Sequence, residues 1–430
     1  MRSNRLSAIA SPAARRWAGL ALSLTALIGA PAQAVPSFTR QTGMECTGCH
    51  IGGFGPQLTP AGMRFKLGGY TDTDGKGTKI PLSGMVVVSG THTSKAQDPP
   101  PEHLKGNDNY TLDEASLFIA GRFSDHIGSF IQITRDGIAH SNGLDQTDVR
   151  LATTTELGGQ DAVLGLTLNN NPGVQDPLHT MPIWSFPFVG SPSAFGSGDA
   201  ATLLNGGLEG RVLGLSAYTL FANSVYAELG SYRSMTPKLQ DKLGLGRDLQ
   251  RLGGNAYWRL AWMPDRKSDA WHVGVFGWNA RLQPDREAGG LYDTYKDVGI
   301  DGGYQFLGTR ENIWTVAASV LNENKREGET GLASHLSERR LAATYSWQQT
   351  WGASAGLFST LGSDPAATTR GQLLQADFTP WGKEGKAAPS PISWANLRVG
   401  LQYWHYNVFG GTRDGASDHD GLFLFAWSAF

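Results

Sequence analysis

Both cysteines of this 430-residue chain fall in one short motif, Cys46-Thr47-Gly48-Cys49-His50. The spacing C-x-x-C-H is typical of covalent attachment of a c-type haem. In that chemistry the thiols of Cys46 and Cys49 form thioethers with the haem vinyl groups, and the imidazole of His50 becomes the proximal iron ligand. The motif therefore predicts one covalently bound haem c, and with it one-electron chemistry carried by the cofactor.

Three other interpretations of the cysteine pair explain less. A thioredoxin-type redox pair occurs within a βαβ unit. Cys46 and Cys49 instead lie in a segment rich in glycine and proline, with no preceding apolar strand. A structural zinc site usually needs four protein ligands, and the chain has no second cysteine pair. A disulfide is compatible with an oxidising compartment but leaves His50 unexplained.

The motif leaves the sixth ligand of the haem iron open. Met63 follows His50 by thirteen residues and is the first candidate for this distal position. A thioether ligand there would tend to raise the reduction potential relative to bis-histidine ligation. The alternative for Met63 is packing against the macrocycle, and a five-coordinate or water-ligated iron is also compatible with the sequence. Four further residues are weaker candidates: Met44, Met85, His92 and His103.

Residues 1–34 have the features of a secretory signal peptide. Four arginines come first, Trp17 to Ala30 is apolar, and Ala32-Gln33-Ala34 is a small-residue cleavage site. Removing four arginines and no acid changes the formal net charge from −2 to −6 (−2 − 4). The mature chain shows no basic patch of the kind that binds nucleic acid, so we expect no nucleic-acid partner.

The rest of the chain alternates polar and apolar residues, as membrane-spanning β-strands do. After residue 34 no apolar run approaches the ~18 residues of a membrane helix. Leu341, Ala343, Tyr345 and Trp347, by contrast, alternate with polar or small residues. In a barrel such an apolar face contacts lipid and the polar face lines the lumen, whereas in a periplasmic β-sandwich, the main alternative, the apolar face points inward.

We therefore predict an all-β fold, an outer-membrane β-barrel of about 16 antiparallel strands over residues 80–430, preceded by a small haem segment at 35–79. The haem segment is too short to build a core alone and must lean on the haem and the barrel. The expected strands lie near residues 80–94, 110–122, 127–136, 145–156, 162–170, 208–220, 223–233, 253–264, 269–283, 295–308, 311–325, 336–349, 351–362, 369–381, 393–407 and 418–430.

The connections and the chain end agree with this barrel. Short and long connections mostly alternate, which is the pattern of periplasmic turns and outer loops in bacterial outer-membrane barrels. The longest connection, 171–207, could fold into the pore as a constriction. Residues 59–69 predict a short helix, with Thr59 as N-cap and Pro60 at its first position. The last expected strand ends on Phe430, and a C-terminal aromatic is common in such proteins.

Charged residues within the expected barrel allow more than one role. The polar strand faces carry Arg122, Arg150, Arg259, Arg340 and Arg398. These arginines could pair with haem propionates, screen anions, or balance inward carboxylates. The long connections carry carboxylates, and a histidine beside them, that could attract Fe(II) or simply be solvated.

The stretches Arg40–His50 and Leu58–Thr71 together resemble the fused outer-membrane monohaem cytochrome–porin family, whose best-known members are extracellular Fe(II) oxidases. The close match is confined to these stretches, and it departs from the family at Ala61 and Met63, where an aromatic residue and an arginine are common. The overall plan is also similar: a signal peptide, one N-terminal haem and a porin.

The resemblance implies an oxidoreductase of the outer membrane, with the haem segment in the pore or at its periplasmic side. Such a protein would be an electron conduit that oxidises an extracellular donor, Fe(II) or another reductant. Its electrons would pass to a periplasmic c-type cytochrome. A diffusion porin plugged by the haem segment, with a transport or structural role, is the alternative function. A soluble periplasmic cytochrome on a β-sandwich is a third hypothesis.

Overall fold

The computed structural model describes residues 35–181, 183–191, 193–196, 198, 200–208, 210–286, 289–383 and 395–430. The predicted signal peptide, residues 1–34, lies outside the described residues. Within them, no helix is long and apolar enough to cross a membrane.

A compact helical segment opens the described chain. It contains α2 (Pro36–Thr42), α3 (Cys46–Cys49), the 3-10 turn η1 (Ile51–Gly53) and α4 (Pro60–Leu67). Thr59 caps α4, because its hydroxyl accepts a hydrogen bond from the Gly62 amide, 3.3 Å away, and Pro60 holds the first helical position without needing an amide partner. The helix predicted at residues 59–69 is therefore confirmed.

The remaining chain is almost entirely antiparallel strand. The strands are β1 (Leu82–Thr93), β2 (Asn109–Arg122), β3 (Ile127–Asp136), β4 (Asn142–Leu157), β5 (Gln160–Asn169), β6 (Val212–Phe221), β7 (Val225–Ser234), β8 (Arg251–Leu252), β9 (Ala256–Trp262), β10 (Asp269–Gln283), β11 (Asp293–Phe306), β12 (Asn312–Arg326), β13 (Ala333–Trp347), β14 (Trp351–Gly362), β15 (Thr369–Phe378), β16 (Asn396–Val408) and β17 (Gly421–Ala429). Short helical turns stand in the connections: η2 (Leu203–Gly207), α5 (Pro237–Lys242), η3 (Pro365–Ala367) and η4 (Ala416–His419).

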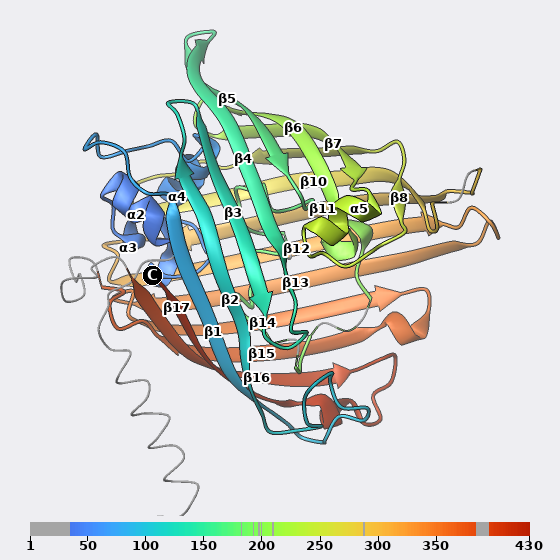
Figure 1. Ribbon diagram of the computed structural model, residues 1–430. Helices are drawn as coiled ribbons and strands as arrows, with labels where there is room; N and C mark the ends of the chain where they lie inside the picture. The colour runs from blue at the N-terminus through green and yellow to red at the C-terminus, as the bar shows by residue number, and fades with distance from the viewer. Residues whose placement is uncertain are drawn as a thin grey trace, which may run out of the picture.

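The strands close into a barrel (Figure 1). Strand β1 pairs with both β2 and β17, and the other strands pair in chain order except around β8, where β7 pairs with β9. The fragments β8 and β9 pair with successive stretches of β10, so they occupy one strand position and the described residues form sixteen strands (17 − 1). The fold class and strand count predicted from the sequence are confirmed. An even number of strands returns the chain end to the side of the barrel from which β1 begins.

The alternation places apolar side chains on the outer wall. Leu213 and Leu215 on β6 are 38% and 58% exposed, whereas the adjacent Val212 and Ser216 are buried. Tryptophans such as Trp347 and Trp351, 44% and 52% exposed, stand at a short turn. This outward apolar band with aromatic residues at its edge is what lipid contact requires.

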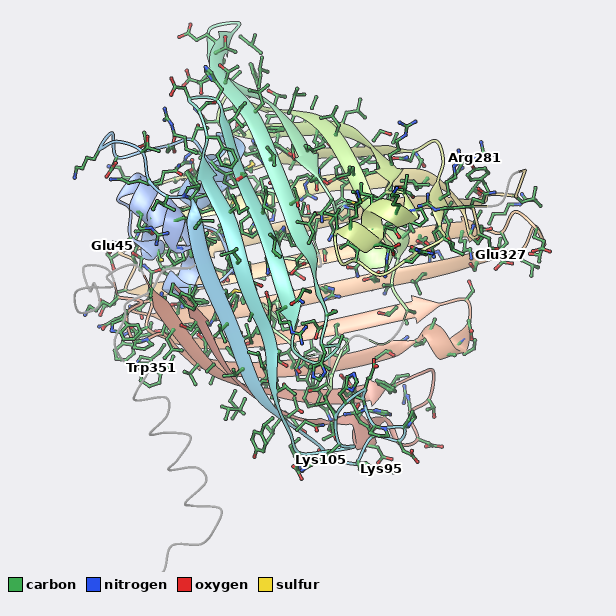
Figure 2. All side chains as sticks on the ribbon, viewed as in Figure 1. Glu45, Lys95, Lys105, Arg281, Glu327 and Trp351 are labelled. Carbon is green, nitrogen blue, oxygen red and sulfur yellow. The ribbon has the colours of Figure 1, made fainter. Side chains whose placement is uncertain are left out.

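The two ends of the barrel differ. Glu45 and Trp351 lie at one end, and Lys95, Lys105 and Arg281 lie at the other (Figure 2). The helical segment and the C-terminus share the first end (Figure 1). The turns near Trp351 and after β2 and β11 are short, so this end corresponds to the periplasmic side in the usual arrangement of bacterial barrels.

The connection between β5 and β6 folds into the lumen, as the sequence predicted. Its residues Met181, Leu203 and Leu204 are buried against Tyr232 of β7 and Trp278 of β10. Carboxylates on three adjacent strands accept backbone hydrogen bonds from the same connection, in the order Glu338–Thr202, Glu323–Leu203 and Asp297–Leu204. We call the described residues of the range 170–211 the in-folded segment. It occupies the lumen with both apolar and buried polar side chains, such as Asn171 and Gln175.

Candidate haem site

Cys46, Cys49 and His50 line one cavity of about 290 Å³. The other walls come from α2 and α4, from the inner faces of β1–β4 and β17, and from the in-folded segment. This volume is close to the lower end of the usual range for small-molecule sites, about 300–1,000 Å³. The structure thus brings all three residues of the sequence motif to the wall of a single cavity.

Local backbone bonds explain how the motif is presented. The His50 amide donates to the Cys46 carbonyl over 2.7 Å, which closes the single turn of α3. Thr59 then ties the returning chain to the motif, since its hydroxyl donates to the Gly48 carbonyl over 2.6 Å and its amide to the Cys49 carbonyl over 2.9 Å. A side chain at Gly62 would place its Cβ 2.4 Å from the Cys49 carbonyl oxygen, so only glycine lets α4 approach α3 this closely.

Burial shifts the pKa values of Cys49 and His50 in the motif. The two cysteines form no disulfide. Burial, with a smaller contribution from Asp72, raises the pKa of Cys49 to about 11, opposite to the lowered pKa of a reactive C-x-x-C thiol. Burial lowers the pKa of His50 to about 4, which keeps the imidazole neutral, as a metal ligand must be. Its Nδ1 is buried with no hydrogen-bond partner among the described residues.

The walls of the cavity are mainly aromatic. Phe38 stacks on Tyr70 with ring centroids 5.4 Å apart and meets Phe65 edge-on at 4.9 Å. On another side Trp184 of the in-folded segment meets Phe130 of β3 at 6.0 Å. An apolar, aromatic surface with few polar groups suits a flat conjugated macrocycle. Together with the two thiols and the neutral imidazole, it fits the predicted haem.

The predicted distal ligand Met63 lies elsewhere. Its side chain is buried in an apolar cluster with Leu67 and Met263, and it lines a different, smaller cavity. It is not among the described residues that line the cavity of His50, and to reach that cavity it would have to leave this packing. The prediction for Met63 stays untested by the structure, but its placement does not favour it.

Two of the weaker distal candidates do reach the cavity. Met44 and Met85 both line it. His92 instead contacts Asp108, and His103 stacks on His140 with ring centroids 4.6 Å apart. Both histidines lie in or beside the loop of Lys95 and Lys105, at the far end of the barrel (Figure 2).

Two cavity residues were missed by the sequence reasoning, His179 and Lys66. His179 lies 129 residues after His50 (179 − 50), inside the in-folded segment. No motif surrounds His179, so the only signal available was the expectation that this long connection folds inward. Lys66 is on α4, and its ammonium donates to the carbonyls of Val174 and Asp176 over 2.6 and 2.9 Å.

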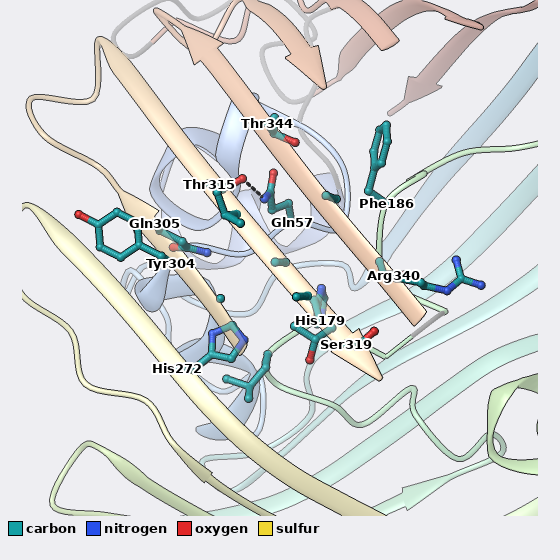
Figure 3. Close-up of a pocket in the computed structure, with 18 of the residues that line it drawn as sticks. Gln57, His179, Phe186, His272, Tyr304, Gln305, Thr315, Ser319, Arg340 and Thr344 are labelled. Carbon is teal, nitrogen blue, oxygen red and sulfur yellow. Dashed lines mark hydrogen bonds between the residues drawn. The ribbon is translucent and has the colours of Figure 1, made fainter. Parts of the chain in front are cut away.

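A second cavity of about 50 Å³ lies on the other side of the in-folded segment. Figure 3 shows His179, His272 and Arg340 among its lining residues, together with the hydrogen bond from Gln57 to Thr315, which is 2.7 Å long. This volume suffices for a few water molecules, and its lining is polar enough to hold them. Gln57 belongs to the helical segment, so the bond also fastens that segment to β12.

Most of the inward arginines balance carboxylates. Arg150 pairs with Asp148 at 2.9 Å, and Arg259 pairs with Asp301 and with Asp176 of the in-folded segment. Arg398 pairs with Asp377. Of the three interpretations offered by the sequence, balance of inward carboxylates is therefore the one observed for Arg150, Arg259 and Arg398. Arg122 instead pairs with Asp125, an exposed carboxylate of the turn after β2. Among the described residues no group of three or more histidine, cysteine or acidic side chains is placed to hold a metal ion.

Comparison with known proteins supports the fold. No protein-family model matches the chain, and no curated protein matches it. Among solved structures, OprB of Pseudomonas putida is 11% identical, with a TM-score of 0.51 over 81% of this chain and 93% of that one. An anion-selective porin from Comamonas acidovorans is 12% identical with a TM-score of 0.44, over 81% and 98% of the two chains. The chain therefore has the fold of an outer-membrane porin-like barrel.

Proposed function

We propose that this protein is an outer-membrane electron conduit with one covalent haem c. The observation that carries the proposal is that Cys46, Cys49 and His50 face one aromatic-lined cavity at an end of a porin-like barrel. The thiols of Cys46 and Cys49 would hold the haem, and His50 would be the proximal ligand. When bound, the haem would supply reversible one-electron chemistry at this position.

The proposed direction of electron flow, from an extracellular donor to the periplasm, is supported by position and resemblance. Glu45, which lines the cavity, lies at the end of the barrel with short turns (Figure 2), where a periplasmic c-type cytochrome would have access. The donor would then come from the opposite, extracellular side, and the resemblance to extracellular Fe(II) oxidases makes Fe(II) the expected donor. The chain's own residues set the position of the haem, and the aromatic walls exclude water from it.

The alternative function, a diffusion porin plugged by the helical segment, is favoured by the likeness to OprB. The contents of the lumen argue against free diffusion in this state. Arg150 and Arg259 are 0% and 1% exposed, although both point inward from the wall. In an open aqueous channel such side chains would be solvated. The in-folded segment and the helical segment cover them instead.

The proposal is tested by visible spectroscopy on intact cells that express the protein together with c-type haem maturation machinery. We expect a c-type haem spectrum that becomes reduced on addition of Fe(II), and no such spectrum from the C46A/C49A variant. A haem that only dithionite reduces would remove Fe(II) as the donor. Wild-type protein without haem would contradict the central claim.

Conductance across planar bilayers separates the two functions. A haem-plugged porin predicts solute conductance that persists or rises when residues 35–79 are removed. A conduit predicts haem-loaded full-length protein with little conductance. The C46A/C49A variant is the matched control, because it keeps the helical segment and loses only the attachment thiols.

A further inference from the structure

We propose that His179, on the in-folded segment, would bind the haem iron as its second protein ligand together with His50. The inference rests on the proposed function, because it assigns a role toward the same haem. It replaces the thioether ligation expected from the sequence with bis-histidine ligation, in which the second imidazole comes from a connection between barrel strands.

The first support is position. His50 follows α3 and His179 belongs to the in-folded segment, yet both line the same cavity. His179 is partly exposed, and it lies beside Trp184, with the two rings stacked at a centroid distance of 4.8 Å and an interplanar angle of 11°. The two imidazoles therefore approach one space from two independent parts of the chain.

The second support is the orientation of the imidazole. Nδ1 of His179 is in hydrogen-bond contact with the carbonyl oxygen of Pro56. A carbonyl only accepts, so Nδ1 must carry the proton and Nε2 keeps its lone pair. Histidines that bind metal usually donate their other ring N–H to a carbonyl or carboxylate in this way. In this structure the lone pair of Nε2 accepts a hydrogen bond from Nζ of Lys66 over 3.1 Å, so binding to iron would require His179 to exchange this bond for the metal. Lys66 also lines the cavity.

The third support is that the backbone around His179 is held rigidly. Its φ is +54°, a conformation that non-glycine residues adopt at some cost and that is concentrated at functional sites. The carboxylate of Asp176 accepts the amides of Leu178 and Thr180 over 2.9 and 3.0 Å. Asp176 is itself paired with Arg259 of β9 at 3.5 Å. A ligand fixed in this way keeps its direction when the cofactor binds.

The competing residues in the cavity already have other roles. The methyl group of Met44 packs against α3, 3.1 Å from where a Cβ of Gly48 would stand. Met85 is buried in an apolar cluster with Phe118. Nζ of Lys66 donates to two carbonyl oxygens and to Nε2 of His179. Among these residues His179 is the one whose ring is oriented by a hydrogen bond on the side away from its metal-binding nitrogen.

The test compares the wild type with H179G, because glycine accepts a φ of +54° without strain and leaves space for an added ligand. The oxidised, haem-loaded proteins are measured by electron paramagnetic resonance and visible spectroscopy. We expect the wild type to be six-coordinate and low-spin, without a sulfur-to-iron charge-transfer band. H179G should become high-spin, and added imidazole should restore the low-spin spectrum. The control H272Q alters a histidine of the second cavity and should resemble the wild type.

The outcomes separate this inference from the proposed function. Haem-loaded H179G that stays low-spin without imidazole would overturn the assignment of His179, as would a sulfur-to-iron band in the wild type. In the first case K66M and M85L would show which neighbour binds the iron. A wild type without covalent haem would instead overturn the proposed function, and this inference with it. Low-spin wild type, high-spin H179G and rescue by imidazole would establish the assignment.

Discussion

Arg398 and Asp377 form a bidentate ion pair between the adjacent strands β16 and β15. Nε and NH2 of the guanidinium donate to the two carboxylate oxygens over 3.0 and 2.9 Å. The remaining nitrogen, NH1, reaches the carbonyl oxygen of Phe54 at 3.5 Å. A pair within the barrel wall thus also binds the backbone of the helical segment, so docking of that segment and the structure of the wall are coupled.

Replacing Arg398 should weaken both the barrel wall and the docking of the helical segment. In R398Q the Asp377 carboxylate is left buried without its cation, and breaking a buried pair in this way costs about 3–5 kcal/mol. We expect the free energy of unfolding in urea, measured in detergent micelles, to fall by about that amount. The double variant D377N/R398Q should recover much of the loss, because no isolated charge then remains.

R247Q is the matched control for this prediction. Arg247 pairs with Asp241 on the exposed surface beside α5, where an ion pair contributes little. The urea unfolding curve of R247Q should overlay that of the wild type. If R398Q and R247Q lowered the free energy of unfolding equally, the Arg398 pair would not be what couples the wall to the helical segment.

The barrel could be predicted from the sequence because lipid on one side and the lumen on the other impose a strict period of two. The segments predicted at 127–136, 269–283 and 351–362 coincide with β3, β10 and β14. Errors occur where that period is interrupted. The strand expected at 253–264 is observed as the shorter β9, 256–262, and the fragment β8 at 251–252 precedes it after a break at residues 253–255. Alternation does not encode such local breaks.

The site was predictable only where a local motif carries the chemistry. The spacing of Cys46, Cys49 and His50 is fixed by the attachment reaction, so it can be read directly. The distal side is assembled by tertiary folding, and distance in the sequence therefore misleads. Met63 is near the motif, but α4 turns its side chain toward the apolar cluster of Leu67. His179 is far away in the chain, and only the inward fold of its connection brings it close.

Tyr70 should make the docking of the helical segment sensitive to alkaline pH. Burial is the main cause that raises the pKa of Tyr70 well above its ordinary value, followed by the Asp148 carboxylate that accepts its hydroxyl at 2.7 Å. Above the unfolded pKa of about 10 the folded protein then binds more protons than the unfolded chain. The stabilising contribution of the protonated Tyr70 hydroxyl is complete below pH ~10 and is lost as the pH rises further.

The measurement is the free energy of unfolding of wild type and Y70F at a series of pH values. Below pH ~10 the wild type should be more stable by about 1–3 kcal/mol, because Y70F removes a buried hydrogen bond. The difference should shrink as the pH rises above that value, since phenylalanine does not titrate. A difference that stays constant into the alkaline range would contradict the assignment to Tyr70.

The two thiols should act independently in holding the haem. In C46A or C49A a single thioether can still form, so we expect reduced amounts of protein with covalent haem. In C46A/C49A covalent haem should be absent. Haem staining of denatured protein after electrophoresis measures this directly, with M63L as a control that leaves the thiols intact. Full staining of the double variant would show that attachment occurs elsewhere.

The carboxylates that hold the in-folded segment should keep the lumen closed. Glu338, Glu323 and Asp297 accept three successive backbone amides over 2.7, 2.6 and 2.9 Å. Replacing all three with alanine leaves those amides without acceptors, at about 1–3 kcal/mol for each buried group. The segment should then leave the wall for part of the time and expose an aqueous path.

Single-channel conductance in planar bilayers detects such openings. We expect frequent open events from D297A/E323A/E338A and few from the wild type. E329A, which alters an exposed carboxylate in the loop between β12 and β13, should behave as the wild type. Glu338 and Glu323 lie on neighbouring strands. If they hold the segment jointly, the double variant E323A/E338A should open more often than the sum of the increases in E323A and E338A. Wild-type protein that already conducts freely would mean that the in-folded segment narrows the lumen without closing it, and the balance would shift toward the plugged-porin function.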